Sequence, residues 1–77
     1  MNNERRSRIS DLQARLEEIK ADIEAINDEE TEAREAMPES LWESERYQSS
    51  EAATENLDSA ISSIEEAIGY LEESTNA

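Results

Sequence analysis

The 77-residue sequence contains no cysteine and no histidine, and it has one glycine and one proline. Without cysteine the chain forms no disulfide and no cysteine-based zinc site, and it has no thiolate nucleophile. Without histidine it lacks the usual general base and the usual metal ligand. Phosphate-binding loops need several glycines, but the single Gly69 lies inside a helical pattern. We therefore expect no enzymatic activity, no bound cofactor and no metal site.

Long apolar runs are also missing. No segment reaches the roughly 18 consecutive apolar residues of a membrane helix, and the first residues, MNNERRSRISDL, lack the apolar stretch of a secretory signal. Asn2 stands where N-myristoylation requires a glycine. From these features we expect a cytoplasmic protein with no membrane association.

Charge of one sign dominates the composition, with 21 acidic and 7 basic residues and a net charge of -14. Direct binding to nucleic acid or anionic lipid needs clustered basic residues, so this composition argues against both. The charge is also unevenly distributed. Residues 1–20 carry five basic and four acidic residues, whereas residues 21–77 carry seventeen acidic residues and only Arg34 and Arg46 as basic ones.

Two sets of aliphatic residues recur with alternating spacings of three and four, as the a and d positions of a heptad repeat do. The first set is Ile9, Leu12, Leu16, Ile19, Ile23 and Ile26. The second set is Leu57, Ile61, Ile64, Ile68 and Leu71. Each set predicts an amphipathic helix whose aliphatic row packs against a neighbouring helix.

Pro38 separates the two sets, and it disfavours helical backbone at Met37. The sequence predicts helix 1 at about residues 4–36, a turn at about residues 37–44 and helix 2 at about residues 45–73, with Ser40 or Ser44 as the N-cap of helix 2. The predicted fold is all-α. Residues 1–77 form one domain, an antiparallel two-helix hairpin of coiled-coil type with a Pro-containing turn near residue 38.

An antiparallel hairpin places the basic residues of helix 1 beside the acidic end of helix 2. A turn near residue 40 pairs positions whose numbers sum to about 80, so Leu16 faces Ile64. The same register puts the basic residues of positions 1–20 alongside Asp58, Glu65 and Glu72. Opposite charges beside a seam favour this orientation of the two helices.

Three alanines that recur every seven residues widen the apolar side of helix 2. Small residues let another helix approach closely, so we expect two hairpins to form a four-helix bundle, with a dimer as the preferred homo-oligomer. The alternative is that these alanines are helix formers on a solvated flank. The predicted oligomer seam is Ala53, Leu57, Ala60, Ile61, Ile64, Ala67, Ile68 and Leu71.

The predicted turn region has a composition of its own. It combines tryptophan, tyrosine, arginine and large apolar residues, which are the types that dominate interface hot spots. It is therefore a candidate binding tip for a partner or ligand. The interpretation that we favour is a structural plug, in which Met37, Leu41 and Trp42 close the open end of the hairpin and Tyr47 packs over Ala33. The candidate tip residues are Arg34, Met37, Leu41, Trp42, Arg46 and Tyr47.

A polar layer is expected just beneath the tip. Extending the two aliphatic rows toward the turn places Glu30, Ser50 and Thr54 in the seam. Such a layer either fixes the register of the two helices or marks a functional pocket.

The linker motif resembles that of a group of small acidic helical-hairpin proteins from phages and mobile elements of Gram-positive bacteria. Those proteins carry a Leu/Met-Pro-Glu-x-Leu-x-x-Ser-Glu-Arg linker between two acidic amphipathic helices. The resemblance implies a bacterial host cell and a phage-type context, and it brings no activity with it. The matching residues are Met37, Pro38, Glu39, Leu41, Ser44, Glu45 and Arg46.

Three hypotheses about function follow. The first is a non-enzymatic phage-type interaction protein, a homo-oligomerising hairpin that binds a protein partner through its tip. The second is inhibition of a host-defence or DNA-processing protein, in which carboxylates imitate nucleic acid and occupy the groove of a basic nucleic-acid-binding protein. The third is sequestration of a small anionic or nucleotide ligand between hairpins by Arg34, Arg46 and Trp42.

Overall fold

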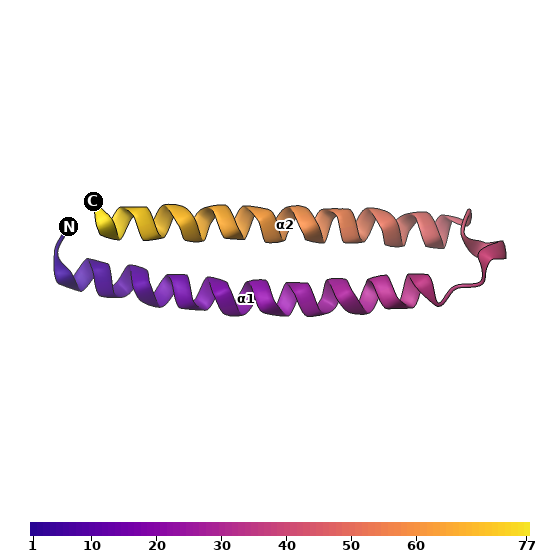
Figure 1. The fold of residues 1–77 in the computed structure, drawn as a ribbon, viewed down its shortest axis with the longest axis horizontal. Helices are drawn as coiled ribbons and strands as arrows, with labels where there is room; N and C mark the ends of the chain where they lie inside the picture. The colour runs from indigo at the N-terminus through magenta and orange to yellow at the C-terminus, as the bar shows by residue number, and fades with distance from the viewer.

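The computed structural model describes residues 1–77 as two long α-helices that lie side by side. Helix α1 spans Asn3–Glu35 and helix α2 spans Glu45–Asn76. The connection between them contains one short 3-10 turn, η1, at Glu39–Leu41. The helices run in opposite directions, so both chain termini lie at one end of the rod and the connection at the other (Figure 1). The all-α class with two packed helices is confirmed.

Side-chain caps define where each helix begins. Asn2 Oδ1 accepts a hydrogen bond from the Arg5 amide at 2.9 Å, and Ser44 Oγ accepts one from the Tyr47 amide at 3.2 Å. Each cap satisfies one of the backbone amides that a helix start leaves without an internal acceptor. Of the two serines expected as caps for α2, Ser44 is therefore the one used.

Helix α2 continues one turn beyond the expected end near residue 73. The hydroxyl groups of Ser74 and Thr75 donate to the carbonyl oxygens of Leu71 and Glu72, at 2.7 and 2.8 Å, which holds the two polar side chains against the last turn. The aliphatic periodicity stops at Leu71, so it carries no information about this final turn.

The seam of α1 differs from the predicted one. Ile9, Leu16 and Ile23 are half-buried against α2, as expected. Leu12, Ile19 and Ile26 are instead 44, 47 and 53% exposed. Their expected place in the seam is taken by a polar row, also spaced by seven residues, that is half-buried. That row is Arg6, Gln13, Lys20, Asn27 and Arg34.

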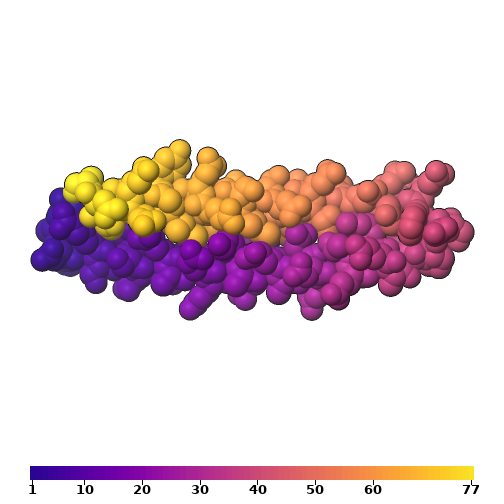
Figure 2. Space-filling view, viewed as in Figure 1, coloured from indigo at the N-terminus to yellow at the C-terminus, as the bar shows by residue number.

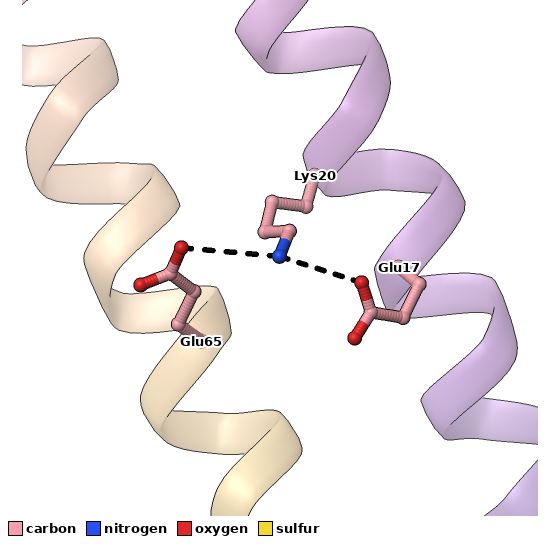
Figure 3. A network of polar contacts seen from close by, with 3 residues as sticks. All are labelled: Glu17, Lys20 and Glu65. Atoms are coloured by element: carbon pink, nitrogen blue, oxygen red, sulfur yellow. Dashed lines mark ion pairs between the residues drawn. The ribbon is translucent and has the colours of Figure 1, made fainter.

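The rotation of α1 has a physical reason, because several polar side chains of this row find acceptors on α2. Asn27 Nδ2 donates to Asp58 Oδ1 at 2.8 Å, and Lys20 Nζ lies 3.8 Å from Glu65 Oε1 (Figure 3). Lys20 also pairs with Glu17 of its own helix at 3.4 Å. Turning Leu12, Ile19 and Ile26 into the seam would break these contacts.

Only one of the predicted ion pairs between the N-terminal basic residues and the acidic end of α2 forms in the structure. Lys20–Glu65 is the only ion pair between the helices, and Arg5, Arg6, Arg8 and Arg15 form none. Exposed pairs of this kind contribute only about 0.2–1 kcal/mol each. Charge pairing within the chain therefore does little to hold the hairpin together.

The hairpin has no buried hydrophobic core. On α2, Leu57, Ile61, Ile64, Ile68 and Leu71 face α1 but are only half-buried. The two buried residues of the whole chain are polar, Ser50 at 8% and Thr54 at 6% exposure. The space-filling view shows a thin rod in which the two helices touch along their length, with no third layer over them (Figure 2). A single chain therefore leaves much of its aliphatic surface in contact with solvent.

Candidate functional site

The connection end of the rod contains a cleft of about 540 Å³. Its walls come from the last turns of α1, the connection and the first turns of α2. Four of the six predicted tip residues line it, namely Arg34, Met37, Leu41 and Arg46. Trp42 and Tyr47 lie beside it, stacked on each other. The structure thus brings the predicted tip residues to one end of the molecule.

Arg34 is the best-anchored of the tip residues. Its Nη1 donates to the Ser50 carbonyl at 3.0 Å, to Ser50 Oγ at 3.3 Å and to Thr54 Oγ1 at 2.9 Å. Ser50 and Thr54 are the two buried residues of the chain, so the guanidinium group satisfies polar atoms that are shielded from water. Arg34 has no carboxylate partner in the hairpin.

The expected polar layer therefore exists, with a different centre. The sequence pattern predicts Glu30, Ser50 and Thr54 together in the seam, and in the structure Arg34 makes the hydrogen bonds to Ser50 and Thr54. Glu30 lines the cleft next to this layer. The layer ties the end of α1 to the start of α2, which fixes the register of the hairpin next to the tip.

Two aromatic rings are held in place above this layer. The rings of Trp42 and Tyr47 stack with their centroids 6.0 Å apart and an interplanar angle of 30°. Arg34 Cζ lies 6.0 Å from the centroid of the Tyr47 ring, in the range of a cation–π contact. Trp42 Nε1 donates to the Met37 carbonyl at 3.0 Å. The indole ring is thereby oriented by a hydrogen bond on one side and by a stacked ring on the other.

The tip is held in place but it is not buried. Trp42 remains 43% exposed and Leu41 47% exposed, and Met37 is half-buried. A plug made by these three side chains would bury them, whereas the connection leaves Leu41 and Trp42 largely open to solvent. The tip therefore presents a pre-oriented aromatic and apolar surface.

Arg46 is the second basic residue that lines the cleft. It is exposed and forms no ion pair. Because Arg34 and Arg46 are the only basic residues after Lys20, both positive charges of the acidic part of the chain line one cleft. The cleft thus has two guanidinium groups next to an apolar wall.

A second surface lies along the middle of the rod. We define the apolar face as Leu12, Ile19 and Ile26 of α1 with Ala53, Ala60 and Ala67 of α2. Ile26 and Ala53 line one shallow groove between the helices, of about 410 Å³, which places both rows on the same side. Ala53 is exposed, and Ala60 and Ala67 are half-buried.

The predicted oligomer seam divides between two locations in the structure. The aliphatic members lie between the two helices of one chain, and the three alanines belong to the apolar face. The aliphatic members are Leu57, Ile61, Ile64, Ile68 and Leu71, and the alanines are Ala53, Ala60 and Ala67. The contribution of Leu12, Ile19 and Ile26 to this face escaped the sequence prediction. The sequence feature that indicates this exposure is the polar row of α1, because it repeats with the same seven-residue spacing and occupies the seam in place of these three residues.

Comparison with known proteins identifies no relative of this chain. No family model matches the chain, and neither a curated protein nor a solved structure matches it significantly. No group of acidic side chains converges closely enough to hold a metal ion. Neither helix has the length and apolarity needed to cross a membrane. The two surfaces described above are therefore the features from which function must be argued.

We expect Arg34→Ala to lower the free energy of unfolding by about 1–3 kcal/mol, because it leaves buried hydroxyl and carbonyl groups without their charged donor. Urea unfolding followed by circular dichroism measures this change. The matched control is Arg46→Ala, an exposed arginine of the same cleft with no hydrogen bond to lose, for which we expect less than about 0.5 kcal/mol. Equal effects of the two substitutions would contradict the structural role of Arg34.

Proposed function

We propose that this protein is a self-associating helical hairpin that presents its tip to a protein partner. One observation carries the proposal: the chain buries no apolar side chain by itself. A chain of this size already buries only about 60% of the surface that it exposes when unfolded, which makes a lone hairpin marginally stable. A second copy that covers the apolar face supplies the missing core.

The exposed aliphatic side chains are numerous enough to form a hydrophobic core with a second copy. Full burial of a leucine or isoleucine stabilises a protein by about 1.5–3 kcal/mol. Leu12, Ile19 and Ile26 are each about half exposed, so covering them adds roughly 1 kcal/mol apiece per chain. Alanines beside them let the backbone of another helix approach closely. The apolar face is therefore suited to a four-helix bundle.

The tip is the proposed site for the protein partner. Trp42, Tyr47 and the two arginines are of the residue types that supply most of the binding energy in protein interfaces. The stacked rings and the hydrogen bonds of Trp42 and Arg34 hold these side chains in place before binding, which reduces the entropy lost on association. A partner segment with an apolar residue next to a carboxylate matches the cleft.

A second candidate function is mimicry of nucleic acid toward a host-defence or DNA-processing protein. The observation that favours it is the placement of carboxylates on α2. After Glu45, the acidic residues of α2 all lie off the row that carries Ala53, Ala60 and Ala67. They are exposed in the single chain, and Asp58 and Glu65 also contact Asn27 and Lys20 of α1. Ordered carboxylates on a rigid helix are suited to a basic groove. These residues are Glu51, Glu55, Asp58, Glu65, Glu66, Glu72 and Glu73.

Self-association predicts that Ile19→Asp converts the oligomer into a monomer and weakens its folding, because the carboxylate would be placed in the centre of the covered face. Sedimentation equilibrium measures the mass. The matched control is Ala21→Asp, which adds the same charge at an exposed position of α1 away from the apolar face. If Ile19→Asp keeps the mass of the wild-type particle, self-association through this face is wrong.

Partner binding predicts that Trp42→Ala loses the partner while the oligomer persists. The test is affinity capture from a bacterial lysate with the wild type, with Trp42→Ala and with Ser40→Ala as an exposed control in the same connection. We expect the partner to be retained only by the wild type and by Ser40→Ala, with little dependence on salt. A partner that stays bound to Trp42→Ala but dissociates at high salt would instead support nucleic-acid mimicry.

A further inference from the structure

We infer that the second copy packs on the apolar face with both tips at the same end of the bundle. This inference rests on the proposed self-association and specifies its geometry. Two arrangements with two-fold symmetry bring the apolar faces together. In one, the hairpins point the same way and α1 lies on the partner's α2. In the other, the hairpins point in opposite directions and α1 lies on the partner's α1.

Helix α2 carries a second seam beside the one that faces α1. Its members are spaced alternately by three and four residues, as required for a row that contacts a neighbouring helix. All are uncharged, and most are small, in a helix that carries eight acidic residues elsewhere. No neighbour within the chain covers the outer part of this row, since Tyr70 is 68% exposed. The row is Ala53, Asn56, Ala60, Ser63, Ala67 and Tyr70.

Side-chain volumes favour the arrangement with both tips together. Within one hairpin Ile26 and Ala53 line one groove, and Ile19 and Ala60 each lie one heptad farther from the tip on their own helix. When α1 lies antiparallel on the partner's α2, each large residue meets a small one, with Ile19 on the partner's Ala60. Every level of the bundle then contains the same volume, and the helices keep one spacing along their length.

The opposite arrangement places large residues on large ones and small residues on small ones. Near the centre of the contact, Ile19 would lie on the partner's Ile19, and Ala60 on the partner's Ala60. The α1 pair would be forced apart while the α2 pair approached closely, which opens a wedge between the two faces. Such a wedge leaves aliphatic surface uncovered, so close packing disfavours this arrangement.

The charges beside the apolar face are complementary in the favoured arrangement. Arg15 lies next to the exposed row of α1 and approaches the partner's Glu66 on the outer side of α2. One heptad further along α1, the flanking residue is acidic, Asp22, and the corresponding residue on the partner is the uncharged Ser59. No like charges are brought together along this flank.

The rod as a whole is large enough for a dimer interface of standard size. It measures 59 Å in length and 15 Å in width, so the apolar face covers only its middle part. A second copy that lies along the whole rod, over the apolar face and the polar residues beyond its ends, covers an area close to the roughly 800 Å² that each partner contributes to a standard-sized interface. With both tips at one end, the two Arg46 side chains and the two Trp42 side chains form one two-fold symmetric surface. A partner that is itself two-fold symmetric matches this surface.

The test is a distance between spin labels on Ser40→Cys, measured by pulsed dipolar spectroscopy on the full chain. The native chain has no cysteine, so one label per copy is introduced at an exposed position of the tip. Helices in a bundle lie about 8–10 Å apart, so tips at one end give an interlabel distance of about 30 Å or less. Opposed hairpins separate the labels by about 50 Å or more, because the tips then lie at opposite ends of helices that rise 1.5 Å per residue.

A second label at Ser62→Cys, near the middle of α2 and outside the apolar face, is the control for dimerisation. Its interlabel distance is measurable in both arrangements and absent in a monomer. A short distance at Ser40→Cys supports the inference. A long distance there, with a dipolar signal at Ser62→Cys, overturns the geometry and leaves self-association intact. The absence of a dipolar signal at both positions overturns the proposed self-association as well.

Discussion

The width of the aliphatic stripe on α1 is the constraint on which this structure depends. The stripe includes Ile9, Leu12, Leu16, Ile19, Ile23 and Ile26. A hairpin gives α1 only one neighbouring helix, and one neighbour covers only part of such a stripe. Half of these residues therefore pack against α2 and the other half remain about half exposed. The missing core, the apolar face and the expected dependence on a second copy all follow from this arrangement.

Polar side chains decide which half of the stripe is covered. Lys20, Asn27 and Arg34 are spaced by seven residues, and each has a contact across the seam with α2. Their acceptors, including Asp58 and Ser50, are specific positions on α2. Polar contacts thus select the register and rotation of the hairpin, although exposed contacts of this type add little to its stability. Stability must then come from covering apolar surface.

The helices and the break between them follow from local sequence, since 3,4 periodicity and Pro38 act within a few residues. The rotation of α1 could not be predicted in the same way. Two rows of α1 with heptad spacing could face α2, the aliphatic row of Leu12, Ile19 and Ile26 and the polar row that includes Lys20 and Asn27. Periodicity alone favours the aliphatic row, and only the positions of the acceptors on α2 favour the polar one. The predicted tip residues lie together at one end of the structure largely because they are neighbours in sequence. Their hydrogen bonds depend on tertiary geometry, as the three bonds of Arg34 to Ser50 and Thr54 illustrate.

The stability of the hairpin is proposed to depend on a second copy that covers its apolar face. The most direct measurement is the melting temperature, followed by circular dichroism, over a hundredfold range of protein concentration. Folding that is coupled to association makes the melting temperature rise with concentration by mass action. We expect a clear rise for the wild type. A melting temperature that does not change over this range would show that the single hairpin is stable by itself and would contradict the account.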